Sequence, residues 1–202
     1  DPLAEAARYG LSDLNRGLAP GTLSAASLQV LAPNALLTVA ADLHSQWMLD
    51  VDQFSHTGSG GTTPGARMTS AGYSFTGSWS WGENIAWAGQ SADLDFDAQI
   101  DIHHRGLFLS DGHRANLLNA AFREIGLSQL PGDFVDSQGA HWQSSMLTED
   151  FAVSGSSVFV TGVVYSDLDL NHFYSVGEGA GGVQIALSGG AATVSEGAGG
   201  YA

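Results

Sequence analysis

The sequence predicts an α+β fold, and the order of its predicted elements carries that prediction. Segments with apolar residues three and four positions apart, typical of amphipathic helices, occupy the chain up to Phe122. After Phe122 the segments "REIGLSQL", "HWQSSMLTEDFA" and "SVFVTGVVYS" have the composition of strands and are bounded by Gly, Pro and Asp. Helices followed by strands favour helices laid over an antiparallel sheet.

The clearest helical pattern covers residues 34–51, with Asn34 placed to cap its N-terminus. Its apolar residues form one stripe at helical spacing: Leu36, Val39, Ala40, Leu43, Trp47 and Val51. A short helix is expected after Thr63, since Thr63 can cap it, Pro64 suits its first position and Gly72 can end it. Further helices are expected over 4–18, 95–109 and from 110 onward.

The charge balance excludes several classes of partner. The chain of 202 residues carries 21 acidic and 6 basic residues, all six of them arginine, for a net charge of −15. Such a field repels nucleic acid and anionic membranes and attracts divalent cations. No apolar run reaches the roughly 18 residues that a membrane span needs, and the chain has no cysteine. Acidic, glycine-rich chains without cysteine are typical of secreted bacterial proteins that use calcium in place of disulfides.

Several ordered motifs resemble one family. The segments "FSHTG", "GENIA", "GHRAN" and "FREIGLS" follow one another in the order found in the CAP superfamily of cysteine-rich secretory, antigen-five and pathogenesis-related proteins, here in its bacterial secreted form. The resemblance covers roughly residues 5–152 and implies an α-β-α sandwich with a large open cleft. We therefore expect a CAP domain over 1–154 and a second segment over 155–202.

The same resemblance implies a metal site in the cleft, formed by His56, Glu83 and His113. Two imidazoles and a carboxylate are ligands that zinc accepts when they converge in space, although another divalent ion would fit the same set. The family's eukaryotic members usually add a second glutamate, which has no counterpart here, so a triad is expected. A structural role for Glu83 is the alternative, because a buried carboxylate needs hydrogen bonds to remain ionised.

Three functions agree with these features. The first is extracellular binding of an unknown ligand, a lipid or a protein, by a secreted CAP domain. The second is a metal-dependent hydrolase, such as a peptidase, in which Glu83 acts as general base toward a metal-bound water. The third is a structural or adhesive extracellular module. Catalysis is the weaker expectation, since no Ser-His-Asp or Cys-His arrangement is evident.

The segment "DLDLNHFYSVGE" predicts a calcium loop. Its oxygen ligands would occupy positions 1, 3, 5, 7 and 12 of the loop, which are Asp167, Asp169, Asn171, Phe173 through its carbonyl, and Glu178. Position 6 is histidine instead of the glycine of an EF-hand, and the flanking segments read as strands. The surrounding sequence resembles the start of the calcium-binding B-type repeats of bacterial surface proteins, so we expect a partial, truncated or processed β-module.

Overall fold

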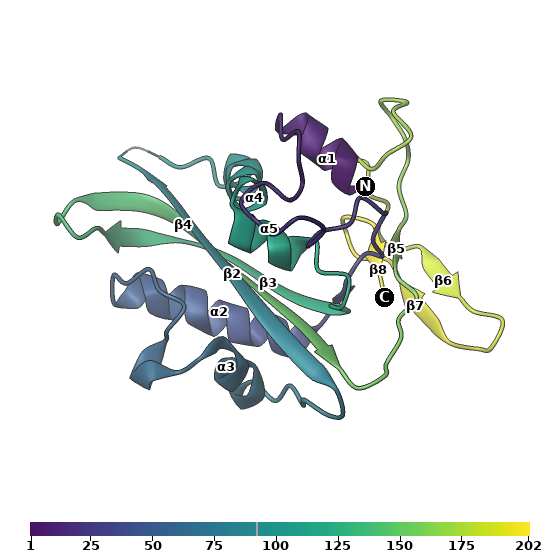
Figure 1. Ribbon diagram of the computed structural model, residues 1–202, viewed down its shortest axis with the longest axis horizontal. Coiled ribbons are helices and arrows are strands. Elements are labelled where there is room, and N and C mark those ends of the chain that lie inside the picture. Colours follow the sequence, from purple (N-terminus) through teal and green to yellow (C-terminus); the bar gives the residue numbers. More distant parts are fainter. Residues whose placement is uncertain (92) are drawn as a thin grey trace. The chain divides into compact units, whose positions relative to one another are not determined.

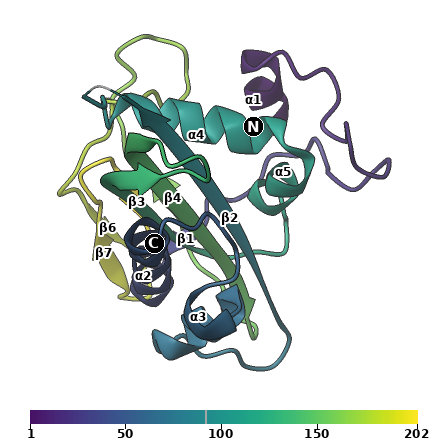
Figure 2. The same cartoon turned by 90° about the vertical axis from the view of Figure 1, so that its left-hand side faces the viewer.

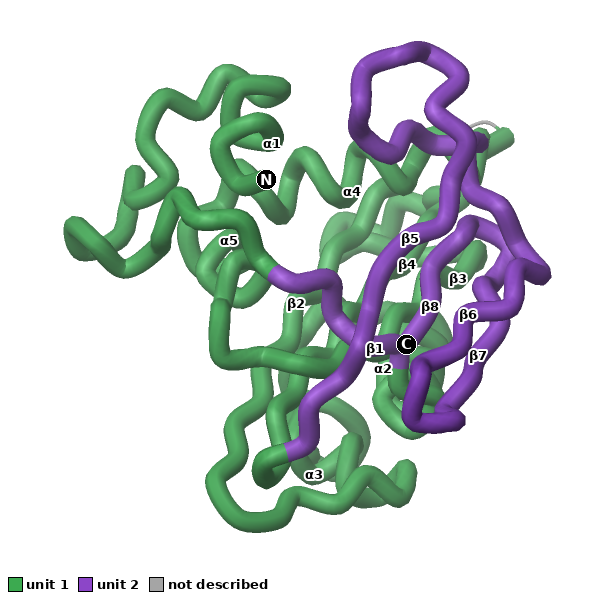
Figure 3. The backbone as a smooth tube through the Cα atoms, turned by 90° about the vertical axis from the view of Figure 1, so that its right-hand side faces the viewer, with its two compact units in different colours: residues 1–28, 34–156 green, residues 29–33, 157–202 purple. Residues whose placement is uncertain are grey.

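The computed structural model describes residues 1–91 and 93–202 and divides the chain into two compact units. Unit 1 comprises residues 1–28 and 34–156, and unit 2 comprises residues 29–33 and 157–202 (Figure 3). None of the helices in the described part of the chain is long and apolar enough to span a membrane.

Unit 1 is built in three layers, which confirms the predicted α+β class and the α-β-α sandwich (Figures 1 and 2). Its antiparallel strands run in the order β3-β4-β2, and helices cover both faces of the sheet. One face carries α2 and α3, and the other carries α4 and α5. The bounds are α1 (Pro2–Arg8), α2 (Ala35–Asp50), η1 (Ser59–Gly61), α3 (Pro64–Ser70), β2 (Trp79–Gln90), α4 (Ala98–Leu109), α5 (Asp111–Leu117), β3 (Glu124–Val135) and β4 (His141–Ser154).

Helix α2 begins where the sequence predicts it to begin. The Asn34 Oδ1 accepts hydrogen bonds from the backbone N–H groups of Leu36 at 2.9 Å and Leu37 at 3.3 Å. These bonds satisfy two of the donors that a helix N-terminus leaves free. Helix α3 is likewise capped by the Thr63 hydroxyl, which accepts from the Ala66 N–H at 3.3 Å.

Only part of the predicted apolar stripe of α2 packs into the core, namely Ala40 and Trp47. Four of its members, Leu36, Val39, Leu43 and Val51, remain exposed. The buried face consists instead of small, polar and apolar residues: Leu37, Ala40, Ala41, His44, Ser45, Met48 and Leu49. Polar members are tolerated there because they find partners, as the Ser45 hydroxyl donates to the Thr148 hydroxyl at 2.8 Å.

Helix α1 is shorter than predicted. It ends at Arg8, and the chain turns at Gly10, whose φ of 67° lies in the left-handed region that favours glycine. The segment after it is held by the buried guanidinium of Arg114, which donates to the carbonyls of Leu14 at 2.9 Å and Phe108 at 3.0 Å and to the carbonyl of Arg16. An irregular segment that Arg114 holds by hydrogen bonds therefore replaces the second half of the helix expected over 4–18.

Unit 2 contains short strands and long connections. Its strands are β1 (Ala32–Pro33), β5 (Gly162–Val163), β6 (Gln184–Ala186), β7 (Ala192–Val194) and β8 (Gly200–Tyr201). Strand β5 pairs with β8, and β6 pairs with β7. The segment "SVFVTGVVYS", predicted as one strand, forms only β5, because its other backbone groups bond to irregular segments, such as Val164 N–H to the Gly199 carbonyl at 2.8 Å.

A single glycine sets the distance between α2 and the sheet. A Cβ atom on Gly126 of β3 would lie 2.1 Å from the Leu37 carbonyl carbon and 2.2 Å from the Thr38 nitrogen. These are backbone atoms of α2, so a side chain could be accommodated only by moving the whole helix. The first turn of α2 can approach β3 closely because residue 126 has no side chain.

We expect Gly126→Ala to destabilise unit 1 by about 1–3 kcal/mol, the usual cost of overpacking a close contact. Gly106 of α4 provides the matched control, because a Cβ there would meet nothing within 4 Å. Gly106→Ala should therefore stabilise by about 0.5–1 kcal/mol through helix propensity. Urea unfolding monitored by tryptophan fluorescence measures both changes. Equal effects of the two substitutions would contradict the close approach.

Candidate functional site

The centre of the candidate site is the carboxylate of Glu83 on β2. Glu83 is only 6% exposed, and its side chain lies on the face of the sheet that α2 and α3 cover. One carboxylate oxygen, Oε1, lies 2.8 Å from Nδ1 of His56. The other, Oε2, accepts from the guanidinium of Arg67 in a buried ion pair. A buried charge is stable in the fold only when it is paired in this way.

Arg67 on α3 joins the site to the loop that precedes it. Its Nη1 donates to the carbonyls of His56 at 3.1 Å and Thr62 at 3.0 Å, while its Nη2 reaches Glu83. The side chain is only 10% exposed. The arginine therefore holds the backbone on either side of η1 in place and neutralises the glutamate at the same time.

His44 of α2 lies behind the same carboxylate. Its Nε2 is 2.9 Å from the Ser55 carbonyl and 4.0 Å from Oε2 of Glu83, and its ring stacks on Trp47 at 5.6 Å. Burial lowers the pKa of His44 below its usual range, although the Glu83 charge acts in the opposite direction. The neutral ring then donates from Nε2 to the carbonyl, which is a structural role.

The two expected cleft histidines are neighbours. The ring centroids of His56 and His113 are 6.5 Å apart with an interplanar angle of 41°. Burial, and next the neighbouring His56, lower the pKa of His113, which favours its neutral form. Half of the His56 side chain, 52%, is exposed, so this pair of imidazoles forms the part of the site that solvent reaches.

The structure brings His56 and Glu83 into contact and His56 and His113 into proximity, but it does not gather all three as direct ligands of one ion. Within residues 1–91 and 93–202, one group alone of three or more His, Cys, Asp or Glu residues offers ligand atoms within 4.8 Å of one another, and it lies in unit 2. Glu83 is not available as a third ligand because its two carboxylate oxygens already contact Arg67 and His56.

A second set of polar residues lies on the opposite face of β2. The Asn116 amide of α5 donates to the Glu83 carbonyl at 3.1 Å and to Oδ1 of Asn84 at 2.9 Å. The Asn84 amide in turn donates to Glu149 at 2.9 Å and to the His113 carbonyl at 3.3 Å. These bonds attach the helix that carries His113 to the strand that carries Glu83, and so fix the two sides of the site relative to each other.

Comparison with models of protein families shows which family this chain is related to. The model of the family described as CAP, cysteine-rich secretory protein family, matches residues 6–133. The chain belongs to the CAP family. The matched range of this CAP domain includes His56, Glu83 and His113, together with Arg67 and Asn116.

Two solved structures are similar to the CAP domain. One is an extracellular protein containing an SCP domain from Bacillus anthracis, with 29% identity over 63% of this chain and 35% of that chain and a TM-score of 0.42. The other is an outer surface protein from Borrelia burgdorferi, with 18% identity over 63% of this chain and 80% of that chain and a TM-score of 0.47. The match thus spans about a third of the Bacillus protein's length. No curated protein matches the sequence.

Two buried acids of unit 1 were not predicted from sequence. Glu149 and Asp150 are consecutive in β4, so their side chains point to opposite faces of the sheet. Asp150 lies directly opposite Glu83 in the strand register, and neither of its carboxylate oxygens has a hydrogen-bond partner among residues 1–91 and 93–202. Two adjacent acids inside the largely buried segment "MLTEDFA" were the signal for this cluster. Arg67 had no comparable signal, since only the fold brings α3 to β2.

Burial dominates the titration of both acids. It raises the pKa of Glu149 to about 7, with the hydrogen bond from Asn84 acting the other way. Burial and the Glu83 charge raise the pKa of Asp150 to about 8, although Arg67 opposes them. At neutral pH the Asp150 carboxyl is therefore mostly protonated in the folded protein and has no net charge to pair.

The acidic loop of unit 2 also has a defined geometry. Asp167, Asp169 and Glu178 offer ligand oxygens that all lie within 4.8 Å of one another. Glu178 is buried, and its carboxylate accepts from the backbone N–H groups of Leu168, Asp169 and Ser175 at 2.7, 3.2 and 2.8 Å. The other two expected ligands belong to the same loop, where the Phe173 N–H donates to Oδ1 of Asn171 at 2.7 Å.

We predict that Asp150→Asn removes part of the pH dependence of stability. Asp150 has a folded pKa of about 8, above the unfolded value of about 3.9. The folded state therefore holds the extra proton between these values. The stability contributed by protonated Asp150 is complete below about pH 4 and is lost as pH rises through 8, by at most about 1.4 kcal/mol per pH unit.

Asparagine has nearly the shape of the protonated acid but does not titrate. The variant should therefore gain stability over the wild type progressively from pH 5 to pH 8, measured by urea unfolding at each pH. Asp97→Asn, at an exposed acid that precedes α4, serves as control and should leave the profile unchanged. Parallel profiles of wild type and Asp150→Asn would contradict an uncharged Asp150.

Proposed function

We propose that this protein is an extracellular bacterial binding protein whose CAP cleft recognises its ligand through a divalent ion. The observation that carries the proposal is the side-by-side placement of His56 and His113 beside a buried carboxylate. Two adjacent imidazoles are a site for zinc or a similar ion. An extracellular location agrees with the absence of cysteine and with the descriptions of both similar structures.

In this proposal Glu83 orients a ligand instead of serving as one. Its Oε1 lies 2.8 Å from Nδ1 of His56, so Nδ1 donates to the carboxylate and Nε2 is left free for a metal ion. A carboxylate that accepts from the far nitrogen of a ligating histidine fixes its tautomer and raises its basicity. The ion would then be held by His56 and His113, with its remaining positions open to water or to the ligand.

A hydrolase using Glu83 as general base is less well supported. A general base needs a free oxygen within reach of the proton that it removes, and both Glu83 oxygens are occupied by Arg67 and His56. We therefore expect no turnover of a peptide or ester library, with or without a chelator. Turnover that chelation and Glu83→Gln both abolish would establish the hydrolase instead.

Zinc titration by calorimetry tests the metal site. Wild type should bind zinc near pH 7 and more weakly below about pH 6, since both imidazoles must be neutral. His113→Ala should abolish binding, and Glu83→Gln should weaken it about 10–100-fold, the usual cost of losing an outer carboxylate partner. The exposed His141, whose side chain is 70% exposed, provides the control His141→Ala. Equal heats for wild type and His113→Ala would reject the site.

We further propose that the loop of unit 2 binds calcium and stabilises that unit. The support is the convergence of Asp167, Asp169 and Glu178 within 4.8 Å. Positive φ values at Leu170 and His172, 59° and 65°, wrap the backbone around this point. Carboxylates gathered in this way repel one another unless a cation neutralises them, and calcium accepts six to eight such oxygen ligands.

Calcium should raise the melting temperature of the protein, because an ion that binds only the folded form stabilises it by mass action, by about 2.7 kcal/mol at 100 times its Kd. Asp167→Asn should remove the shift. Asp93→Asn, an acid in an exposed loop of unit 1, should retain it. An unchanged melting temperature in calcium, or an equal shift with Asp167→Asn, would show that the acidic loop is only solvated.

A further inference from the structure

The outward face of α2 presents an apolar stripe to solvent. Leu36, Val39 and Leu43 lie three and four positions apart, and their side chains are on one side of the helix. Their exposed fractions are 41%, 43% and 65%. An exposed apolar line of this kind on a helix is typical of a surface that another molecule covers.

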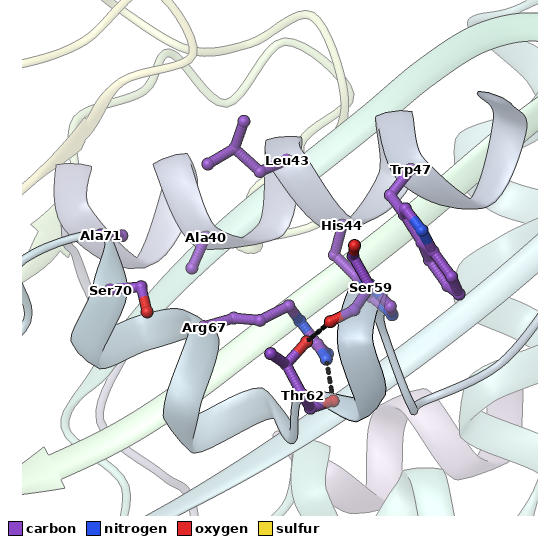
Figure 4. Close-up of a pocket in the computed structure, with 9 residues that line it drawn as sticks. All are labelled: Ala40, Leu43, His44, Trp47, Ser59, Thr62, Arg67, Ser70 and Ala71. Carbon is purple, nitrogen blue, oxygen red and sulfur yellow. Dashed lines mark hydrogen bonds between the residues drawn. The ribbon is translucent and has the colours of Figure 1, made fainter. Parts of the chain in front are cut away.

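A pocket opens beside this stripe, between α2 and α3. Its volume is about 220 Å³, and Figure 4 shows Leu43, Ala40 and Trp47 along one wall and Ala71 on the other. Ser59, Thr62 and Ser70 contribute polar groups to its lining. We call the stripe and this pocket together the α2–α3 groove, defined by Leu36, Val39, Ala40, Leu43, Trp47 and Ala71. Arg67 and His44 also line the pocket.

We infer that the α2–α3 groove docks a cationic amphipathic helix of a partner protein, with one large apolar side chain in the pocket. The pocket is smaller than the roughly 300–1,000 Å³ of most small-molecule sites. It is nonetheless large enough for a single aromatic or aliphatic side chain, since a cavity of about 150 Å³ accommodates benzene. A line of apolar residues beside a pocket is the arrangement that helix-in-groove recognition uses.

Charge complementarity favours a partner with a positive net charge at the groove. The protein carries a net charge of −15, and α2 contains Asp42 and Asp50 but neither lysine nor arginine. The single arginine that lines the pocket, Arg67, is already paired with Glu83. This field disfavours an anionic membrane and a second copy of the chain, and it favours a helix whose polar face carries lysine or arginine.

The inference rests on the proposed function in one respect, since it gives the extracellular binding protein a protein partner. The residues that define the groove are not proposed metal ligands, although His44 and Arg67, which contact Glu83, also line its pocket. Zinc titration of the same preparations therefore separates the two, because loss of zinc binding leaves the α2–α3 groove intact and loss of peptide binding leaves the imidazole pair intact.

The test uses a fluorescein-labelled synthetic helix of 18 residues, with lysines on one face and leucines and one tryptophan on the other. Fluorescence anisotropy should show binding to the wild-type chain that weakens as salt is added. A peptide with glutamate in place of every lysine should bind at least tenfold more weakly. Vesicles of phosphatidylglycerol should not bind the protein, and binding to them in place of the peptide would overturn the inference.

Two matched pairs of variants locate the site. Leu43→Ser and the pocket-filling Ala71→Leu should each weaken peptide binding about tenfold, the effect of losing an anchor contact. Leu3→Ser, at a leucine of α1 that is 54% exposed, and Ala66→Leu, on the exposed side of α3, should leave it unchanged. Leu43 is exposed, whereas Ala71 is half-buried against the core beneath α2 and α3. Unchanged zinc binding by each variant shows that it is folded. Equal affinities within either pair would reject the α2–α3 groove.

Discussion

The structure around the candidate site in unit 1 depends on the buried carboxylate of Glu83, which must be paired to remain charged. Removing a carboxylate from water costs several kcal/mol unless an opposite charge and hydrogen bonds replace the water. Here the replacement comes from Arg67 of α3 and from His56, which follows α2. Because Arg67 also donates to two backbone carbonyls of the loop containing η1, the course of that loop depends on the same ion pair.

The sheet carries buried acids on both faces near its centre. Because their pKa values are raised, the stability of the site depends on pH. Glu83 and Asp150 are directly opposite each other across β2 and β4, and two adjacent carboxylates cannot both be charged at low cost in a buried position. Arg67 pairs with Glu83, and Asp150 accordingly holds its proton. On the other face Glu149 accepts from Asn84, which also contacts the backbone of His113. Each face therefore contacts one of the two imidazole-bearing residues: Glu83 contacts His56, and Asn84 contacts the backbone of His113.

Helix α2 shows how tertiary context determines which face of a helix is buried. Against the sheet it places His44 and Ser45, whose polar atoms bond to Ser55 and Thr148. Leu37, Met48 and Leu49 are buried with them, whereas Leu36, Val39, Leu43 and Val51 remain exposed. The close approach at Gly126 explains this orientation in part, since only a glycine in β3 allows the backbone of the first α2 turn so near the sheet. The apolar surface left outside forms the α2–α3 groove.

The sequence alone determined the interactions between residues that are close together along the chain. The caps at Asn34 and Thr63 and the end of α3 before Gly72 were predictable, because each depends on residues within one helical turn. The spacing of Asp167, Asp169 and Glu178 was equally predictable, since a loop of twelve consecutive residues brings its own acids together. His56, Glu83 and His113 were identified through ordered family motifs, and which of them lie in contact could not be derived from spacing.

Only the tertiary structure decided how the distant parts meet. The buried face of α2, the pairing of Arg67 with Glu83 and the protonation of Asp150 all depend on strand register and on helices brought together from separate parts of the chain. The shortened α1 has the same cause, because the buried Arg114 bonds to carbonyls about 100 positions away, at Leu14 and Arg16. Propensity and periodicity act within a few residues, whereas burial, which sets the cost of every charge in this site, is a property of the assembled fold.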